Sequence, residues 1–206
     1  MKIGVRIQLA TMMFLEFFVW GGWYVTMGTY LTQTFRASGV DLALAYETQS
    51  IGALIAPFIV GLIADRYFAA QKLLGVLHLF GGVLLILAAN QNSFLLFYPF
   101  VLSYMILFMP TLALVNAIAL RKMKDPSKEF TAIRTLGTLG WIAAGLSIGK
   151  LGREKTLSLE NTFIMAGVAS IFLGLYSFFL PDTPPHKDKN EKISLKSALG
   201  LSLIHI

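Results

Sequence analysis

The sequence has no cysteine and little charge. None of its 206 residues is cysteine, and only 14% are Asp, Glu, Lys or Arg. The absence of cysteine excludes disulfide bonds, thiolate metal sites and cysteine nucleophiles. Soluble domains carry about 25% charged residues, whereas 56% of this chain is hydrophobic. A chain with so little polar surface does not stay soluble when folded, so the composition predicts an integral membrane protein.

Patterns that carry enzyme chemistry are missing as well. We find no metal-ligand spacing, no glycine-rich phosphate loop and no Ser/His/Asp arrangement. A membrane-embedded enzyme would need catalytic groups clustered at one membrane face, and the polar residues here are scattered singly. The net charge of +6 does not indicate a nucleic-acid partner, because the basic residues lie in short loops between apolar blocks. We therefore expect no enzyme activity, no cofactor or metal, and no nucleic-acid binding.

What the sequence does contain is a series of long apolar runs, near the length of about 20 residues that a helix needs to cross a bilayer. The predicted spans are residues 7–31, 42–64, 73–89, 94–120, 131–149 and 163–180. The predicted fold is an all-α membrane protein, with a six-helix transmembrane bundle over residues 1–180. Residues 181–196 are rich in proline and charge and are predicted to form a cytoplasmic linker. Residues 197–206 resemble the start of a seventh span that is cut off.

The distribution of lysine and arginine predicts the orientation of the bundle. Loops on the side of the N-terminus hold twelve of the 17 cations, the opposite side holds four, and Arg134 lies inside the fifth predicted span. Cytoplasmic loops of membrane proteins carry the excess of positive charge. We therefore expect the N-terminus and the linker after the sixth span to be cytoplasmic, in a multi-pass protein of the cell (inner) membrane.

The turn after the second span reads GLIADRYFAAQK, residues 61–72. Gly61, Asp65 and Arg66 resemble the signature loop of the major facilitator superfamily, and the later residues depart from that signature. The resemblance implies a conformational latch, in which the acid pairs with a basic residue on another helix in one state of a transporter. The alternative is an ordinary hydrophilic turn in which Asp-Arg occurs by chance.

Four segments together resemble a narrower family, the nucleoside:proton symporters of this superfamily. They are FLEFFVWGGWYVTMGTYL (14–31), GLIADRYF (61–68), MPTLALVNAI (109–118) and AIRTLGTLGW (132–141), in the order of that family's N-terminal half. The family has twelve spans, so the resemblance implies half a transporter, whose partner would be a missing C-terminal six-helix half. It implies import of nucleosides by proton symport, with the two halves rocking around a central site in alternating access.

Arg134 is the most informative single residue. It lies roughly 9 Å from the centre of the fifth span, on the cytoplasmic side, and an unpaired arginine at that depth costs a few kcal/mol. Snorkelling toward the headgroups is one way to lower that cost. In the resembling family this arginine contacts the nucleoside. Thr138 and Trp141 share its helix face, and Asn116 in the fourth span could bind substrate or only join two helices. The four residues form the predicted substrate site.

Glu16 is a second ionisable residue, about 4.5 Å from the centre of the first span. It could be a neutral acid packed among aromatic side chains. It could instead pair with Arg134 on the neighbouring fifth span, or alternate between these states as a proton-coupled carrier requires. His78 in the third span could relay protons, although such a histidine is more often neutral and hydrogen-bonded to an adjacent helix.

Glycines in the membrane-spanning runs are expected to allow close helix packing. Gly21 and Gly22 in the first span are flanked by Trp20 and Trp23, which are expected to fill space or line the cavity. The fifth span contains Gly137, Gly140, Gly145 and Gly149.

Two alternatives to nucleoside transport stay open. If Arg134 belongs to the packing of the fold and not to the site, the cargo could be a sugar or another small polar metabolite. A chain of six spans could also be a non-transporting helical membrane subunit that pairs with another chain, because it supplies only one wall of a cavity.

Overall fold

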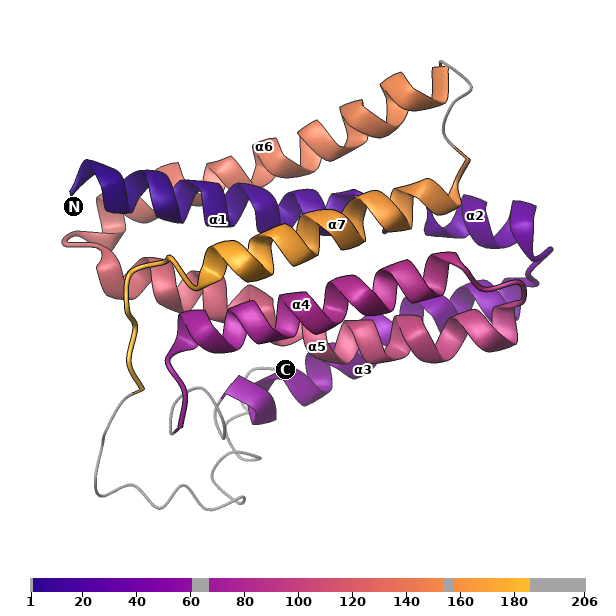
Figure 1. Ribbon diagram of the computed structural model, residues 1–206, viewed down its shortest axis with the longest axis horizontal. Helices are drawn as coiled ribbons and strands as arrows, with labels where there is room; N and C mark the ends of the chain where they lie inside the picture. The colour runs from indigo at the N-terminus through magenta and orange to yellow at the C-terminus, as the bar shows by residue number, and fades with distance from the viewer. Residues whose placement is uncertain (1, 61–66, 154–157, 186–206) are drawn as a thin grey trace.

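The computed structural model describes residues 2–60, 67–153 and 158–185, and all regular structure in that part is helical. The prediction of an all-α protein is confirmed. The helices, labelled in Figure 1, are α1 (Ile3–Gly21), α2 (Met27–Thr34), α3 (Gly39–Ile59), α4 (Ala70–Ala89), α5 (Phe94–Lys122), α6 (Pro126–Arg153) and α7 (Glu160–Ser177).

The helices run along one long axis. In Figure 1 the N-terminus, the α5–α6 turn and the end of α7 lie at one end, and the α2–α3 and α4–α5 turns lie at the other. α4 packs against both α5 and α7, α3 packs against α5, and α1 packs mainly against α6 and α7. The α4–α5–α7 group is therefore the centre of the bundle, with α3 on one side and the α1–α6 pair on the other.

The first predicted span is interrupted in the structure. α1 ends at Gly21 and α2 begins at Met27, with turns between them. Glycine has low helix propensity, and the turn lets Trp23 enter the core, where its ring lies 5.3 Å from that of Tyr104 and 5.5 Å from that of Phe163. Burial of a large aromatic side chain offsets the loss of helical hydrogen bonds at this point.

Four helices, α1, α3, α4 and α5, are long and apolar enough to cross a membrane. The other two long helices, α6 and α7, occupy the positions of the fifth and sixth predicted spans, but within the described residues they do not meet the same measure of length and hydropathy. A multi-pass helical protein is thus what the structure shows, and the exact number of six spans stays a prediction.

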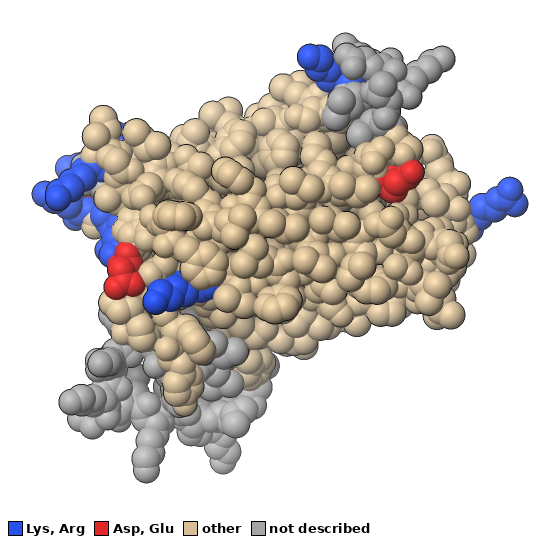
Figure 2. All heavy atoms as spheres, in the orientation of Figure 1, with Lys and Arg blue, Asp and Glu red and all other residues tan. Residues whose placement is uncertain are grey.

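Charged side chains lie toward the two ends of the bundle, and the flank between them in Figure 2 carries almost none. An uncharged flank of this kind suits contact with lipid chains. The end that holds the N-terminus has the larger share of the described cations: Lys2, Arg6, Lys72, Arg121, Lys122, Lys124 and Lys128, against Arg36 and Lys150 at the other end.

Glycines bring two pairs of helices into close contact. A Cβ atom at Gly140 of α6 would lie 2.0 Å from the carbonyl oxygen of Phe14 in α1, and one at Gly82 of α4 would lie 2.6 Å from the carbonyl oxygen of Gly167 in α7. Such backbone approach is possible only without a side chain. The packing role predicted for Gly137 and Gly140 is therefore confirmed.

Gly145 and Gly149 do not show this role within the described part of the chain, where a Cβ atom at either position would have no neighbour within 4 Å. Both lie toward the C-terminal end of α6 (Pro126–Arg153), and Figure 1 shows that this end of the helix diverges from the other helices.

The chain after α7 is held against the starts and ends of other helices. The Gln71 side chain donates to Asp182 Oδ1 at 2.7 Å and accepts from the Thr183 N–H at 2.9 Å, and the Ala70 N–H donates to Thr183 O at 3.0 Å. The Lys122 ammonium group donates to the carbonyl oxygen of Asp182. The first residues of the predicted linker are therefore attached to α4 and α5. Residues 186–206, which hold the rest of the linker and the predicted seventh span, lie outside the described residues.

We predict that Gly140→Ala lowers the stability of the protein and that Gly145→Ala does not. Both changes add the same methyl group to an α6 glycine, but only the first meets backbone, and overpacking of this kind costs about 1–3 kcal/mol. The measurement is the melting temperature of each purified variant in detergent. Equal melting temperatures for the two variants would contradict the close contact between α1 and α6.

Candidate functional site

A buried carboxylic side chain lies at the centre of the bundle. Glu16 of α1 is fully buried, at 0% exposure. One of its oxygens, Oε2, lies 2.8 Å from Nε2 of His78 in α4. The other, Oε1, accepts a hydrogen bond of 2.7 Å from the hydroxyl of Thr111 in α5. Each oxygen therefore has a partner, as a buried acid requires.

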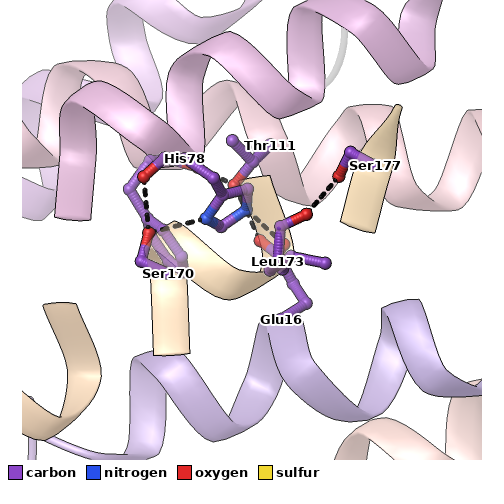
Figure 3. Close-up of polar contacts among 7 residues, drawn as sticks. Glu16, His78, Thr111, Ser170, Leu173 and Ser177 are labelled. Atoms are coloured by element: carbon purple, nitrogen blue, oxygen red, sulfur yellow. Dashed lines mark hydrogen bonds and ion pairs between the residues drawn. The ribbon is translucent and has the colours of Figure 1, made fainter. Parts of the chain in front are cut away.

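The imidazole of His78 is held from its other side as well. Its Nδ1 lies 2.9 Å from the hydroxyl oxygen of Ser170 in α7, and the same hydroxyl donates a 2.9 Å hydrogen bond to the carbonyl oxygen of His78. Figure 3 shows Glu16, His78, Thr111 and Ser170 pointing toward one another from their helices. The four residues, called the polar cluster below, join α1, α4, α5 and α7.

The ion pair predicted between Glu16 and Arg134 is absent among the described side chains, and His78 takes the place of the arginine. The Arg134 guanidinium carbon lies 4.1 Å from the centre of the Phe17 ring. Consecutive residues point about 100° apart around a helix. The α1 residue that meets α6 is therefore Phe17, and Glu16 faces α4 and α5 instead.

For His78 the sequence left two alternatives, a proton relay and a hydrogen bond to an adjacent helix. The structure shows hydrogen bonds from His78 to adjacent helices, as in the second alternative. The pairing of His78 with Glu16 is not predicted from the sequence, because the two residues are 62 positions apart and no local pattern links them. One feature of the sequence could have indicated this pairing: Glu16 and His78 are isolated titratable residues at similar depth in two apolar helices.

Two of the predicted substrate residues share a hollow on the surface of α6. Arg134 and Thr138 line an open hollow of about 370 Å³ together with Phe130, Thr131 and Thr135. Cation–π contact with Phe17 holds the guanidinium from one side, while its N–H groups have no salt-bridge partner among the described residues. The arginine is therefore partly buried and still able to bind a ligand.

The other two predicted substrate residues lie outside that hollow. Trp141 packs against Trp20 of α1, with ring centres 5.5 Å apart and the planes nearly perpendicular. Asn116 of α5 has a buried side-chain oxygen without a hydrogen-bond partner in the described part of the chain. The structure thus joins Arg134 with Thr138, and Trp141 with Trp20, but it does not bring all four predicted residues to one hollow.

Trp20 is a further residue of interest. Its ring contacts those of Phe17, Tyr24, Phe108 and Trp141, so it connects α1 with α5 and α6. The indole N–H is buried and has no hydrogen-bond partner among the described residues. The residues predicted to form a conformational latch, Gly61, Asp65 and Arg66, lie outside the described part.

Known transporters share this arrangement of helices. Two crystal structures of the nucleoside transporter NupG, one of them a mutant, match with TM-scores of 0.88 and 0.85 at 28% and 26% sequence identity; the match covers 98% of this chain and 50% of theirs. YegT of Escherichia coli (strain K12) is 38% identical over 201 residues, 96% of this chain and 47% of YegT. The xanthosine permease of the same strain is 34% identical over 204 residues, 97% of this chain and 48% of the permease. These relatives are transporters and permeases by name, and the class of fold that the chain shares with them is that of a multi-pass helical membrane protein.

The family can be stated as well. The family model described as Nucleoside H+ symporter matches residues 1–206, and the chain belongs to that family. The resemblance found in the sequence is confirmed. The chain spans about half the length of the curated relatives it matches, at 47% and 48% of the first two.

We predict that Glu16→Ala destabilises the protein and that Glu16→Gln retains most of its stability. Alanine leaves His78 Nε2 without a partner in the core, which costs about 1–3 kcal/mol for an unsatisfied group, while the Thr111 hydroxyl keeps its hydrogen bond to the carbonyl oxygen of Phe108. Glutamine keeps an acceptor for Thr111 and offers an N–H to His78. Thermal unfolding followed by tryptophan fluorescence measures the difference, and a wild-type melting temperature for Glu16→Ala would rule out the polar cluster.

Proposed function

We propose that this chain forms one half of a secondary active transporter that imports nucleosides by proton symport. The observation that carries the proposal is the position of Arg134 beside Thr138 in an open hollow, with the guanidinium held by Phe17. A fixed guanidinium without an acidic partner is a binding group for a neutral polar ligand that offers acceptor oxygens. Membership of the nucleoside H+ symporter family supports the choice of ligand.

The chemistry of the proposed site suits a nucleoside. Arg134 donates to ribose hydroxyl oxygens or base carbonyls, and the Thr138 hydroxyl both donates and accepts. Trp141 offers an aromatic surface for a flat base. The unpartnered Asn116 oxygen is an acceptor that becomes available to the ligand if the helices rearrange. These are the four residues that we assign to substrate binding.

The proposed transport cycle needs a second wall for the site. Because the chain spans about half of its relatives, a further six-helix half would face the hollow and close it. The two halves would alternate between openings to either side of the membrane. Gly61, Asp65 and Arg66 are proposed as the latch that stabilises one of these states.

We place the N-terminus and the linker on the cytoplasmic side of the membrane, the inner membrane in bacteria. The support is the excess of described cations at the end of the bundle that holds the N-terminus. Protease or cysteine-labelling experiments on intact cells and inverted vesicles would test this orientation.

The experiment for the proposed substrate uses the protein as its gene encodes it, in cells without nucleoside permeases of their own. We predict uptake of labelled uridine or adenosine that stops when the proton gradient is collapsed. Arg134→Ala should lower the uptake by about tenfold or more, as loss of a charged hydrogen bond of about 1.5–3 kcal/mol implies. Lys150→Ala, at the exposed far end of α6, is the matched control and should transport normally.

Three outcomes separate the alternatives. Normal uptake by Arg134→Ala, at equal membrane level, would remove the proposed site. Proton-driven uptake of a sugar, without uptake of any nucleoside, would support the transporter fold but show that the substrate is a sugar. No uptake of either class of substrate would favour the non-transporting subunit.

A further inference from the structure

The hydrogen bonds around Ser170 determine which nitrogen of His78 carries hydrogen. A serine hydroxyl has one hydrogen to donate, and Ser170 Oγ lies 2.9 Å from both the His78 carbonyl oxygen and its Nδ1. A carbonyl oxygen can only accept, so the hydroxyl hydrogen belongs to that bond. The remaining contact then requires an N–H at Nδ1 that donates to the serine oxygen.

With its hydrogen at Nδ1, a neutral His78 has a bare lone pair at Nε2. That nitrogen lies 2.8 Å from Glu16 Oε2, a hydrogen-bond distance that needs one proton between the two atoms. Either the acid is protonated and donates to the imidazole, or an imidazolium donates to the carboxylate. In both forms the pair holds one titratable proton and has no net charge.

Removal of that proton would leave the pair with a charge of −1 and with two lone pairs facing each other. Glu16 is 0% exposed and His78 is 1% exposed, so water does not solvate the charge in this arrangement. An isolated buried carboxylate is costly enough that proteins avoid it. The proton is therefore retained as long as the four helices stay together around the pair.

We propose that Glu16 and His78 together bind the proton that the transporter carries, and that Ser170 is the positioning residue that holds the imidazole in the accepting tautomer. The proposal rests on the proposed function, because it assigns a site to the proton of the symport. A proton from the aqueous phase adds to the pair when it has a charge of −1 and makes it neutral. Release to the other aqueous phase reverses that step.

Other polar and charged groups near the pair come from each neighbouring helix. Thr111 Oγ1 of α5 lies 2.7 Å from the second oxygen of Glu16 and 2.5 Å from the carbonyl oxygen of Phe108, so its one hydrogen is shared between these two acceptors. Arg134 of α6 is the basic side chain on that side, and it stacks on Phe17 instead of meeting the acid. Among the described residues, His78 is thus the one basic partner of Glu16.

The position of the pair also connects proton binding with the substrate residues. α1 packs mainly against α6 and α7, and the Glu16–His78 hydrogen bond fastens it to α4. The next residue, Phe17, supports the Arg134 guanidinium. A movement of α1 that follows loss of the proton would therefore displace the support of Arg134, which lowers its hold on a nucleoside.

The test uses the purified full protein in liposomes, with labelled uridine as substrate and a pH-sensitive dye for proton movement. Glu16→Gln keeps both hydrogen bonds but cannot exchange a proton, so it resembles the protonated pair permanently. We expect this variant to exchange uridine for uridine across the membrane. It should move no protons together with uridine, and it should not accumulate uridine against a uridine gradient. Glu47→Gln, an exposed acid on α3, is the matched control and should behave as wild type.

The results distinguish failure of the proton-site assignment from failure of the proposed function. Proton movement with uridine in Glu16→Gln would overturn the assignment, and so would loss of uridine exchange, because glutamine preserves the contacts of the pair. Wild-type protein that exchanges uridine without proton movement would instead refute the symport, and wild-type protein without exchange would refute the proposed function itself.

A measurement that does not depend on transport tests the role of Ser170. Nitrogen NMR of histidine-labelled protein distinguishes the tautomers, and His78→Gln identifies the signal of His78 among the 3 histidines. We expect hydrogen at Nδ1 in wild type and a mixture of tautomers in Ser170→Ala. Hydrogen at Nε2 with a bare Nδ1 in the wild type, or an unchanged signal in Ser170→Ala, would overturn the positioning role.

Discussion

The contact on which this bundle depends is the one between a buried acid and a buried imidazole. A carboxyl group inside an apolar bundle needs a partner for each oxygen, and Glu16 finds its partners on α4 and α5, while Ser170 of α7 holds the imidazole. The rotation and depth of four helices are therefore set together, since a change in any one of them leaves a polar atom unsatisfied. Hydrophobic packing alone would allow these helices to rotate against one another with smaller penalties.

Small residues make this geometry possible. Gly82 and Gly167 bring the backbones of α4 and α7 into contact, and His78 and Ser170 lie within one turn of them. Gly140 does the same for α1 and α6, which places Phe17 under Arg134. The short side chains set the distance between helices, and the polar side chains between them then reach one another directly.

The sequence was sufficient for the helical class, the approximate position of each helix and the family. These features follow from local composition and from short motifs, which can be recognised in a single sequence. The partner of Glu16 could not be predicted, because it depends on how α1 is rotated relative to its neighbours, and Glu16 and Phe17 face different helices although they are adjacent. The break after Gly21 could not be predicted either, since the apolar run continues through it and the burial of Trp23 in the turn becomes visible only in the structure.

The attachment of the chain after α7 has a mechanical consequence. Gln71 holds Asp182 and Thr183 at the beginning of α4, and His78 lies seven residues further along the same helix, about two turns away. Asp182 and Thr183 are therefore anchored beside α4. Tension applied to these residues would therefore act on α4, which carries the imidazole, and also on α5, because Lys122 and Arg121 hold the carbonyl oxygens of Asp182 and Pro184.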